Sequence, residues 1–197
     1  MKISFFLISS LLFIHITQAQ FKYDTVRICN QTWMKKNLDV LTYRNGDSIP
    51  NVTDPTAWAA LTTGAYCYYN NDSAYAVFFG KLYNWYAVND SRGLAPTGWH
   101  IPSDAEWTTL ETGLRDTSVA VGKLEVTDTT TWILMSRSIG ASNTSGWAGI
   151  AGGNRHGNGS FKDVGDFGYW WSSTESTTTY AWYRYLYYNL GTIYRFN

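Results

Sequence analysis

The sequence predicts an α+β fold, and three features carry that prediction. Apolar residues recur at three- and four-residue spacing in 78–88 and in 103–115, which predicts two helices that each bury one face. Residues 169–173 and 181–188 are rich in Trp and Tyr, a composition typical of strands. Before these strands, residues 140–168 are rich in glycine, which predicts a long, irregular loop region.

The first third of the chain is predicted to contain a hairpin, a short helix and a strand. Residues 22–40 hold two short strand segments separated by a turn. Asp54 and Pro55 suit the N-cap and first position of a helix that ends before Gly64. Residues 65–69 are a strand candidate.

The helix at 103–115 has the clearest predicted start. Ser103 and Glu106 are spaced as a capping box, in which each side chain bonds the other residue's backbone N–H. The apolar stripe that follows consists of Trp107, Leu110 and Leu114.

The N-terminus is typical of a signal for export. Lys2 provides a positive start, and residues 3–16 are mostly apolar but too short to span a bilayer. We therefore expect residues 1–19 to be a cleaved signal peptide. Residues 20–197 then form a single domain that is secreted or held at the cell surface, with no membrane span.

Composition narrows the class of partner. The chain has 15 basic and 15 acidic residues, and no basic stripe, which argues against nucleic acid. Aromatic residues reach 17%, with 10 Trp, whereas charged residues are only 15%. This composition suits either an aromatic core or an exposed surface on which sugars or proteins stack. The two cysteines, Cys29 and Cys67, allow one disulfide or two unpaired thiols.

Five stretches, in order, resemble the Fibrobacter succinogenes major paralogous domain family, exported proteins of Bacteroidetes and relatives. The resemblance spans about residues 24–196. The stretches are Asn30–Leu38, Gly80–Val88, Gly98–Trp107, Gly122–Leu124 and Tyr169–Glu175.

The resemblance implies a C-type-lectin-like fold, with two main helices flanking small antiparallel sheets and a long Gly-rich loop region. Residues 99–107 are also similar to the helix start of formylglycine-generating enzymes, which share that fold. The family usually continues into a final strand whose cysteine would pair with Cys67. This sequence ends at Asn197, so we expect a domain that lacks its last strand. Cys29 stands where the family more often has glycine, which argues against a Cys29–Cys67 bridge.

Catalysis is not expected. Formylglycine-generating enzymes use a pair of late cysteines, and this sequence has none after Cys67. His156 with Asp163 or Asp166 is the remaining acid–base pair, but nothing marks a nucleophile beside it. A remnant enzyme is therefore the third hypothesis for function.

No cofactor is predicted, and metal content is left open. Four oxygen-bearing side chains in the Gly-rich region suit Ca²⁺, although such residues often bond their own backbone instead. They are Asn154, Asn158, Asp163 and Asp166.

The first hypothesis is an exported, non-catalytic binding domain for carbohydrate or a cell-surface polymer. Alternation puts one set of late aromatic residues in the core and turns the other outward. The predicted ligand-binding residues are Arg155, His156, Asp166, Trp170, Trp171, Glu175 and Trp182. The alternative is a protein-interaction or structural surface module that contacts a cell-envelope protein, which would supply the missing strand.

Overall fold

A computed structural model describes residues 23–115, 145–147, 149–178, 180–187 and 190–197. The predicted signal peptide and the stretch Gly122–Leu124 lie outside these residues. No helix in the described ranges is long and apolar enough to cross a membrane.

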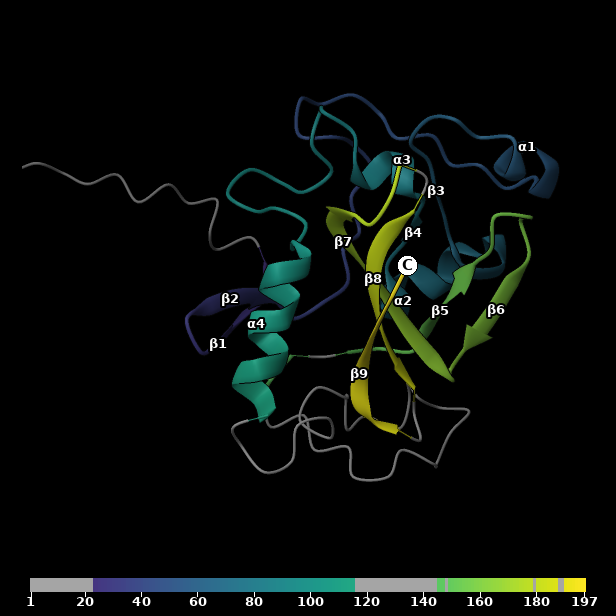
Figure 1. Ribbon diagram of the computed structural model, residues 1–197. Coiled ribbons are helices and arrows are strands. Elements are labelled where there is room, and N and C mark those ends of the chain that lie inside the picture. Colours follow the sequence, from purple (N-terminus) through teal and green to yellow (C-terminus); the bar gives the residue numbers. More distant parts are fainter. Residues whose placement is uncertain (1–22, 116–144, 148, 179, 188–189) are drawn as a thin grey trace, which may run out of the picture.

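The described chain is mixed α+β, built around a five-stranded sheet with the order β6-β5-β7-β8-β9 (Figure 1). All neighbouring strands are antiparallel except β5 and β7, which are parallel. In Figure 1, α4 and the β1–β2 hairpin lie on one side of β7, β8 and β9. The sheet strands are β5 (Gly152–Arg155), β6 (Phe161–Val164), β7 (Phe167–Glu175), β8 (Ala181–Tyr187) and β9 (Leu190–Phe196).

Two further sheets have two strands each. β1 (Thr25–Ile28) and β2 (Gln31–Met34) form the predicted hairpin, and β3 (Tyr66–Cys67) pairs with β4 (Leu82–Tyr83). The helices are α1 (Pro55–Ala59), α2 (Ala76–Phe79), α3 (Trp85–Val88) and α4 (Asp104–Arg115), with 3-10 turns η2 (Tyr69–Asn71) and η3 (Ser73–Tyr75).

The predicted start of α4 is confirmed. The backbone N–H of Ser103 donates to Glu106 Oε2 at 2.8 Å, and the N–H of Glu106 donates to Ser103 Oγ at 3.2 Å. The predicted stripe is also confirmed, because its three residues are buried in one cluster between α4, the hairpin and the sheet. That cluster consists of Ile28, Trp33, Trp107, Leu110, Leu114, Trp147 and Leu186.

The prediction of one helix over 78–88 is wrong. Gly80 adopts a φ of +70°, which ends α2 after a single turn. Leu82 and Tyr83 then pair with β3, and Asn84 starts α3 by accepting from the N–H of Ala87 at 3.0 Å. The two predicted main helices are therefore one long helix, α4, and a broken segment that contains β4.

The prediction of irregular backbone over 140–168 is also wrong where the structure describes it. Residues 152–155 and 161–164 form the β5–β6 hairpin, and β7 already begins at Phe167. In this region glycine allows the backbone to lie close to neighbouring elements, and it does not mark an irregular loop. At Gly159, φ is +83° and an added Cβ would lie 2.5 Å from Pro55 Cα. The glycines therefore let a hairpin pack tightly against α1.

A buried ion-pair network joins α4 to the sheet. Arg184 on β8 has a side chain with no exposed surface, and it donates to Asp104 Oδ1 at 2.7 Å and to Glu111. Arg195 on β9 donates to the same Asp104 at 2.9 Å. Burial by itself would raise the pKa of Asp104, but the hydrogen bonds from Arg195 and Arg184 hold it below its usual value.

The two cysteines are unpaired in this structure. Cys29 is exposed in the β1–β2 turn, where its φ is +54°. Cys67 is buried on β3, and burial raises the pKa of its thiol to about 11. A left-handed φ favours glycine, so the geometry accounts for the glycine that the family resemblance implies at position 29.

Candidate binding cleft

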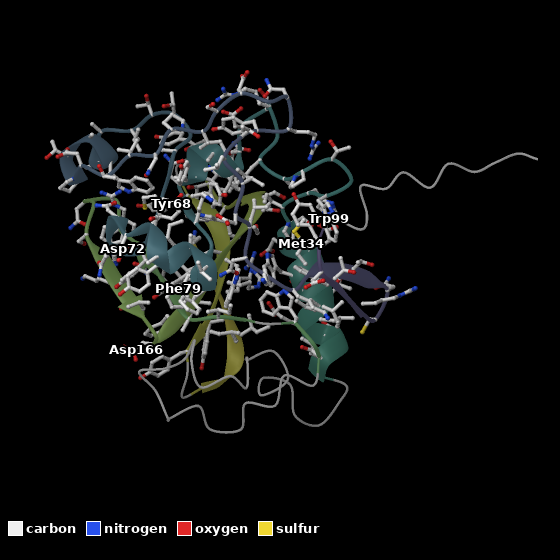
Figure 2. The ribbon with its side chains drawn as sticks, turned by 180° about the vertical axis from the view of Figure 1, so that it is seen from behind. Met34, Tyr68, Asp72, Phe79, Trp99 and Asp166 are labelled. Carbon is white, nitrogen blue, oxygen red and sulfur yellow. The ribbon has the colours of Figure 1, made fainter. Side chains whose placement is uncertain are left out.

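Residues from several elements line a cleft of about 1080 Å³. Figure 2 shows Phe79 on one side and Met34 and Trp99 on the other. One wall is built from β2, residues 97–102 and the start of α4. The opposite wall comes from β4 and β5, and Tyr169, Trp170 and Trp171 of β7 complete the lining.

Indole rings form a connected group along the cleft. The centroid of Trp33 lies 4.9 Å from that of Trp107 and 6.3 Å from that of Trp147. Trp147 in turn lies 5.1 Å from Trp170, centroid to centroid. Trp33, Trp107 and Trp147 are buried, so this group is core packing behind the cleft surface, and rings packed against one another in this way have few rotamers available.

Adjacent Trp170 and Trp171 point to opposite faces of β7, yet both line the cleft. Trp170 Nε1 donates to Asn37 Oδ1 at 2.9 Å, and Trp171 Nε1 donates to the Tyr83 carbonyl at 3.0 Å. Trp171 also packs against Trp85, with centroids 5.7 Å apart. Since both indole N–H groups are occupied, these side chains offer a ligand ring surface rather than a donor.

Polar groups meet the aromatic lining at Tyr169. Its hydroxyl donates to Asp163 Oδ2 at 2.9 Å, and Asn154 Nδ2 donates to the same oxygen at 3.2 Å. Burial, followed by the Asp163 carboxylate, raises the pKa of Tyr169, so the hydroxyl stays protonated at neutral pH. Asp163 adopts a φ of +66°, a conformation costly for a non-glycine residue.

Arg155 lines the cleft, but its guanidinium is already bonded to other parts of the protein. It donates to the carbonyls of Val52 at 2.6 Å and Thr53 at 2.8 Å, and it lies 4.4 Å from the Trp58 ring centroid. His156 follows it at the exposed rim. Of the predicted ligand-binding residues, the structure therefore brings Arg155, His156, Trp170 and Trp171 to one cleft.

The other three predicted residues lie elsewhere. Asp166 occupies the turn between β6 and β7, away from Met34 and Trp99 in Figure 2. Glu175 ends β7 and accepts from Asn89 Nδ2 at 3.0 Å. Trp182 lies under the Arg195 guanidinium, 3.3 Å from the ring centroid.

Three buried polar atoms on cleft-lining residues have no hydrogen-bond partner within the described parts of the chain. They are Gln31 Oε1, Trp33 Nε1 and Asn154 Oδ1. Buried polar groups are nearly always satisfied, so three such atoms along one cleft mark it as a place for ligand or ordered water.

The candidate calcium ligands are engaged in local contacts. Asn158 Oδ1 accepts from the Ser160 hydroxyl at 2.7 Å, and Asp163 accepts from Tyr169 and Asn154. Among the residues that the structure describes, no three His, Cys, Asp or Glu side chains are placed to share a metal ion.

Beside the cleft, one face of the sheet carries a continuous group of aromatic side chains, here named the aromatic strip. In cross-strand register, Trp171 faces Tyr183 and Tyr185 faces Tyr194, all away from α4. Every member is at least partly exposed. The strip consists of Phe167, Tyr169 and Trp171 on β7, Tyr183, Tyr185 and Tyr187 on β8, and Tyr194 and Phe196 on β9.

Sequence reasoning missed most of the cleft residues outside β7. The family resemblance could have indicated some of these residues, because the stretches that carry it contain Trp33, Trp85 and Trp99. The segments 30–38, 81–88, 98–107 and 169–171 all contribute to the cleft lining. Position along the chain did not indicate that these stretches converge.

The chain matches a known protein family. The family model for the Fibrobacter succinogenes major domain matches residues 26–196. No curated protein and no solved structure matches this chain.

Proposed function

For this chain, which belongs to the Fibrobacter succinogenes major domain family, we propose the function of an exported, non-catalytic domain that binds carbohydrate in its cleft. Residues 1–19 would direct export. The fold would be a variant of the C-type-lectin-like architecture, in which the β1–β2 hairpin and the five-stranded sheet enclose α4.

The observation that carries the proposal is the lining of the cleft. Its volume of about 1080 Å³ is slightly above the roughly 300–1,000 Å³ usual for ligand sites. Fixed ring faces such as Trp171 suit the C–H surfaces of sugar rings. The hydroxyl of Tyr169 and the amide N–H of Asn154 both donate to Asp163, so their oxygens would serve as acceptors for sugar hydroxyls.

Charge supports a neutral ligand in the cleft. The Arg155 guanidinium donates hydrogen bonds to backbone carbonyls, and Lys81, whose side chain is 4% exposed, is paired with Asp39. Neither of these two cations is free to attract an anionic group, which leaves the exposed Lys36 as the remaining lysine or arginine of the described cleft lining. A ligand rich in hydroxyls satisfies such a site without a counter-charge.

The binding test uses two variants and one control. Isothermal titration with a panel of neutral oligosaccharides should give binding to the wild-type domain. Trp99→Ala and Tyr169→Phe should weaken that binding about fivefold or more, since one stacking contact or hydrogen bond contributes on the order of 1 kcal/mol. Tyr180→Ala should have no effect, because Tyr180 is 60% exposed and does not line the cleft. Equal affinities for all four proteins would reject the cleft as the site.

Absence of catalysis is tested separately. We propose that the domain performs no reaction; His156, the histidine of the remnant-enzyme hypothesis, has a backbone N–H that donates to the Ser160 carbonyl at 2.8 Å. Prolonged incubation with a bound oligosaccharide should release no reducing ends. Turnover that disappears in His156→Ala would favour the remnant enzyme.

A protein-interaction module is the second candidate, favoured by the position of β9 at an edge of the sheet. An edge strand is a template for strand addition by another chain. Size-exclusion mass measurements and capture from cell envelopes distinguish the two functions: a stoichiometric protein partner, with no sugar bound, would favour this candidate.

A further inference from the structure

We propose that the ligand is a long, neutral polysaccharide that leaves the cleft across the aromatic strip, so that cleft and strip form one extended binding surface. The inference rests on the proposed function of the cleft and adds the size and charge of the ligand.

The rings of the aromatic strip contact one another and form a continuous surface. Tyr185 stacks on Tyr194 at 5.0 Å with an interplanar angle of 13°, and Phe167 stacks on Tyr187 at 4.5 Å and 25°. Phe196, at the outer strand, is 55% exposed. Aromatic side chains in mutual contact keep their orientation, so the surface is ordered without a ligand.

Cleft and strip are continuous. Tyr169, Trp171 and Tyr183 belong to both, because they line the cleft and also stand on the strip face of β7 and β8. Tyr183 then contacts Phe196 at 5.9 Å between centroids. A ligand that stacks on Trp171 thus has an unbroken path of rings out to β9.

The dimensions favour a polymer. Phe167 and Trp171 are four residues apart on β7, which corresponds to about 13 Å at roughly 3.3 Å per residue. Crossing from β7 to β9 adds two strand spacings of roughly 4.8 Å each. A surface of this size, added to the cleft, exceeds what one or two sugar rings would cover.

The charge of the strip favours a neutral polymer. All of its members are aromatic, and the nearby arginines Arg184 and Arg195 point to the α4 side, where both contact Asp104. The Asp163 carboxylate beside Tyr169 already accepts two hydrogen bonds. An anionic polymer would lose hydration here without gaining a cationic partner.

The experiment measures affinity against chain length. Disaccharides to hexasaccharides of the cello-, xylo- and manno- series are titrated into the domain, and the parent polymers are tested by pull-down. Polygalacturonate is the anionic probe. The variants are Tyr185→Ala and Phe196→Ala on the strip, with Tyr180→Ala as the matched exposed aromatic control. Because Phe196 lies at the exposed edge, its variant should fold even if Tyr185→Ala does not.

We expect affinity for one neutral series to rise at least tenfold from disaccharide to hexasaccharide. Each strip variant should lower hexasaccharide affinity by about fivefold and leave disaccharide affinity unchanged. Flat chain-length dependence, or strip variants equal to Tyr180→Ala, would overturn the inference and leave the cleft proposal standing. Equal binding of polygalacturonate would overturn the neutral ligand. No binding by any probe would reject both proposals together.

Discussion

Asp104 accepts hydrogen bonds from two arginines, Arg184 and Arg195. Arg184 is fully buried, so removal of Asp104 leaves its guanidinium with Glu111 as the remaining carboxylate partner among the described residues. We predict that Asp104→Ala lowers the free energy of unfolding by about 3 kcal/mol, measured by urea denaturation. Asp47→Ala, which breaks the exposed pair with Arg92, is the control and should change little. Similar small losses for both variants would contradict the role of the network.

The same carboxylate should make stability depend on pH. The folded-state pKa of Asp104 is lowered, and so is that of Glu106: burial opposes the shift, but bonds from the Ser103 N–H and hydroxyl outweigh it. A lowered pKa means that the stabilisation is present above the unfolded-state values of about 4 and lost as pH falls through the folded-state values. Urea midpoints should therefore be constant near neutral pH and fall below about pH 4, less steeply in Asp104→Asn. A urea midpoint that rises on acidification would contradict this prediction.

Cys29 carries backbone strain that a single substitution removes. Its φ of +54° lies in the region that glycine occupies at no cost. We predict that Cys29→Gly raises the free energy of unfolding by about 1 kcal/mol, whereas Cys29→Ala does not, as thermal denaturation can show. Equal stability of the two variants would mean that the turn is unstrained.

At this scale, short-range chemistry was predictable from sequence. The bonds of Ser103 and Glu106 and the Asp54 cap, which accepts from the Ala57 N–H at 2.7 Å, depend on residues three positions apart. Which of Trp170 and Trp171 faces α4 was not predictable, because strand register fixes it. The pairing of Trp170 with Arg184 settles that question.

At the scale of the elements, a substitution at Gly80 distinguishes one continuous helix over residues 78–88 from the broken segment seen in this structure. In an uninterrupted helix, Gly80→Ala would stabilise by about 1 kcal/mol. In this structure φ is +70° and an added Cβ would lie 2.9 Å from the Leu38 carbonyl oxygen. We therefore predict that Gly80→Ala destabilises the domain, as measured by thermal denaturation. A gain in stability would instead favour a single helix over residues 78–88.

The two incorrect element predictions share a cause. Leu82 and Trp85 fit helical spacing, but Leu82 is held on β4 by Cys67, fifteen positions earlier. The glycines of 152–168 predict loose backbone, yet Gly152 pairs with Val164 in a hairpin that packs against β7. In both segments, pairing between distant residues overrides a local pattern.

Across the whole molecule, the cleft is a product of tertiary structure. Trp33, Trp99 and Trp171 come from three separate parts of the chain and line one cleft only in the folded protein. Composition indicates an aromatic surface or core, and this chain has both: the cluster beneath α4 and the strip on the opposite face of the sheet. Family resemblance identified the segments that line the cleft, but not that they surround a single cleft.

The central claim is that carbohydrate occupies this cleft, and tryptophan indole N–H resonances report on it most directly. In a ¹⁵N spectrum, a neutral hexasaccharide that binds should shift the Trp99 and Trp171 signals, which line the cleft. Trp182, which lies outside it under Arg195, should stay unchanged. Shifts confined to Trp182, or a ligand that binds and moves none of the cleft indoles, would contradict the account.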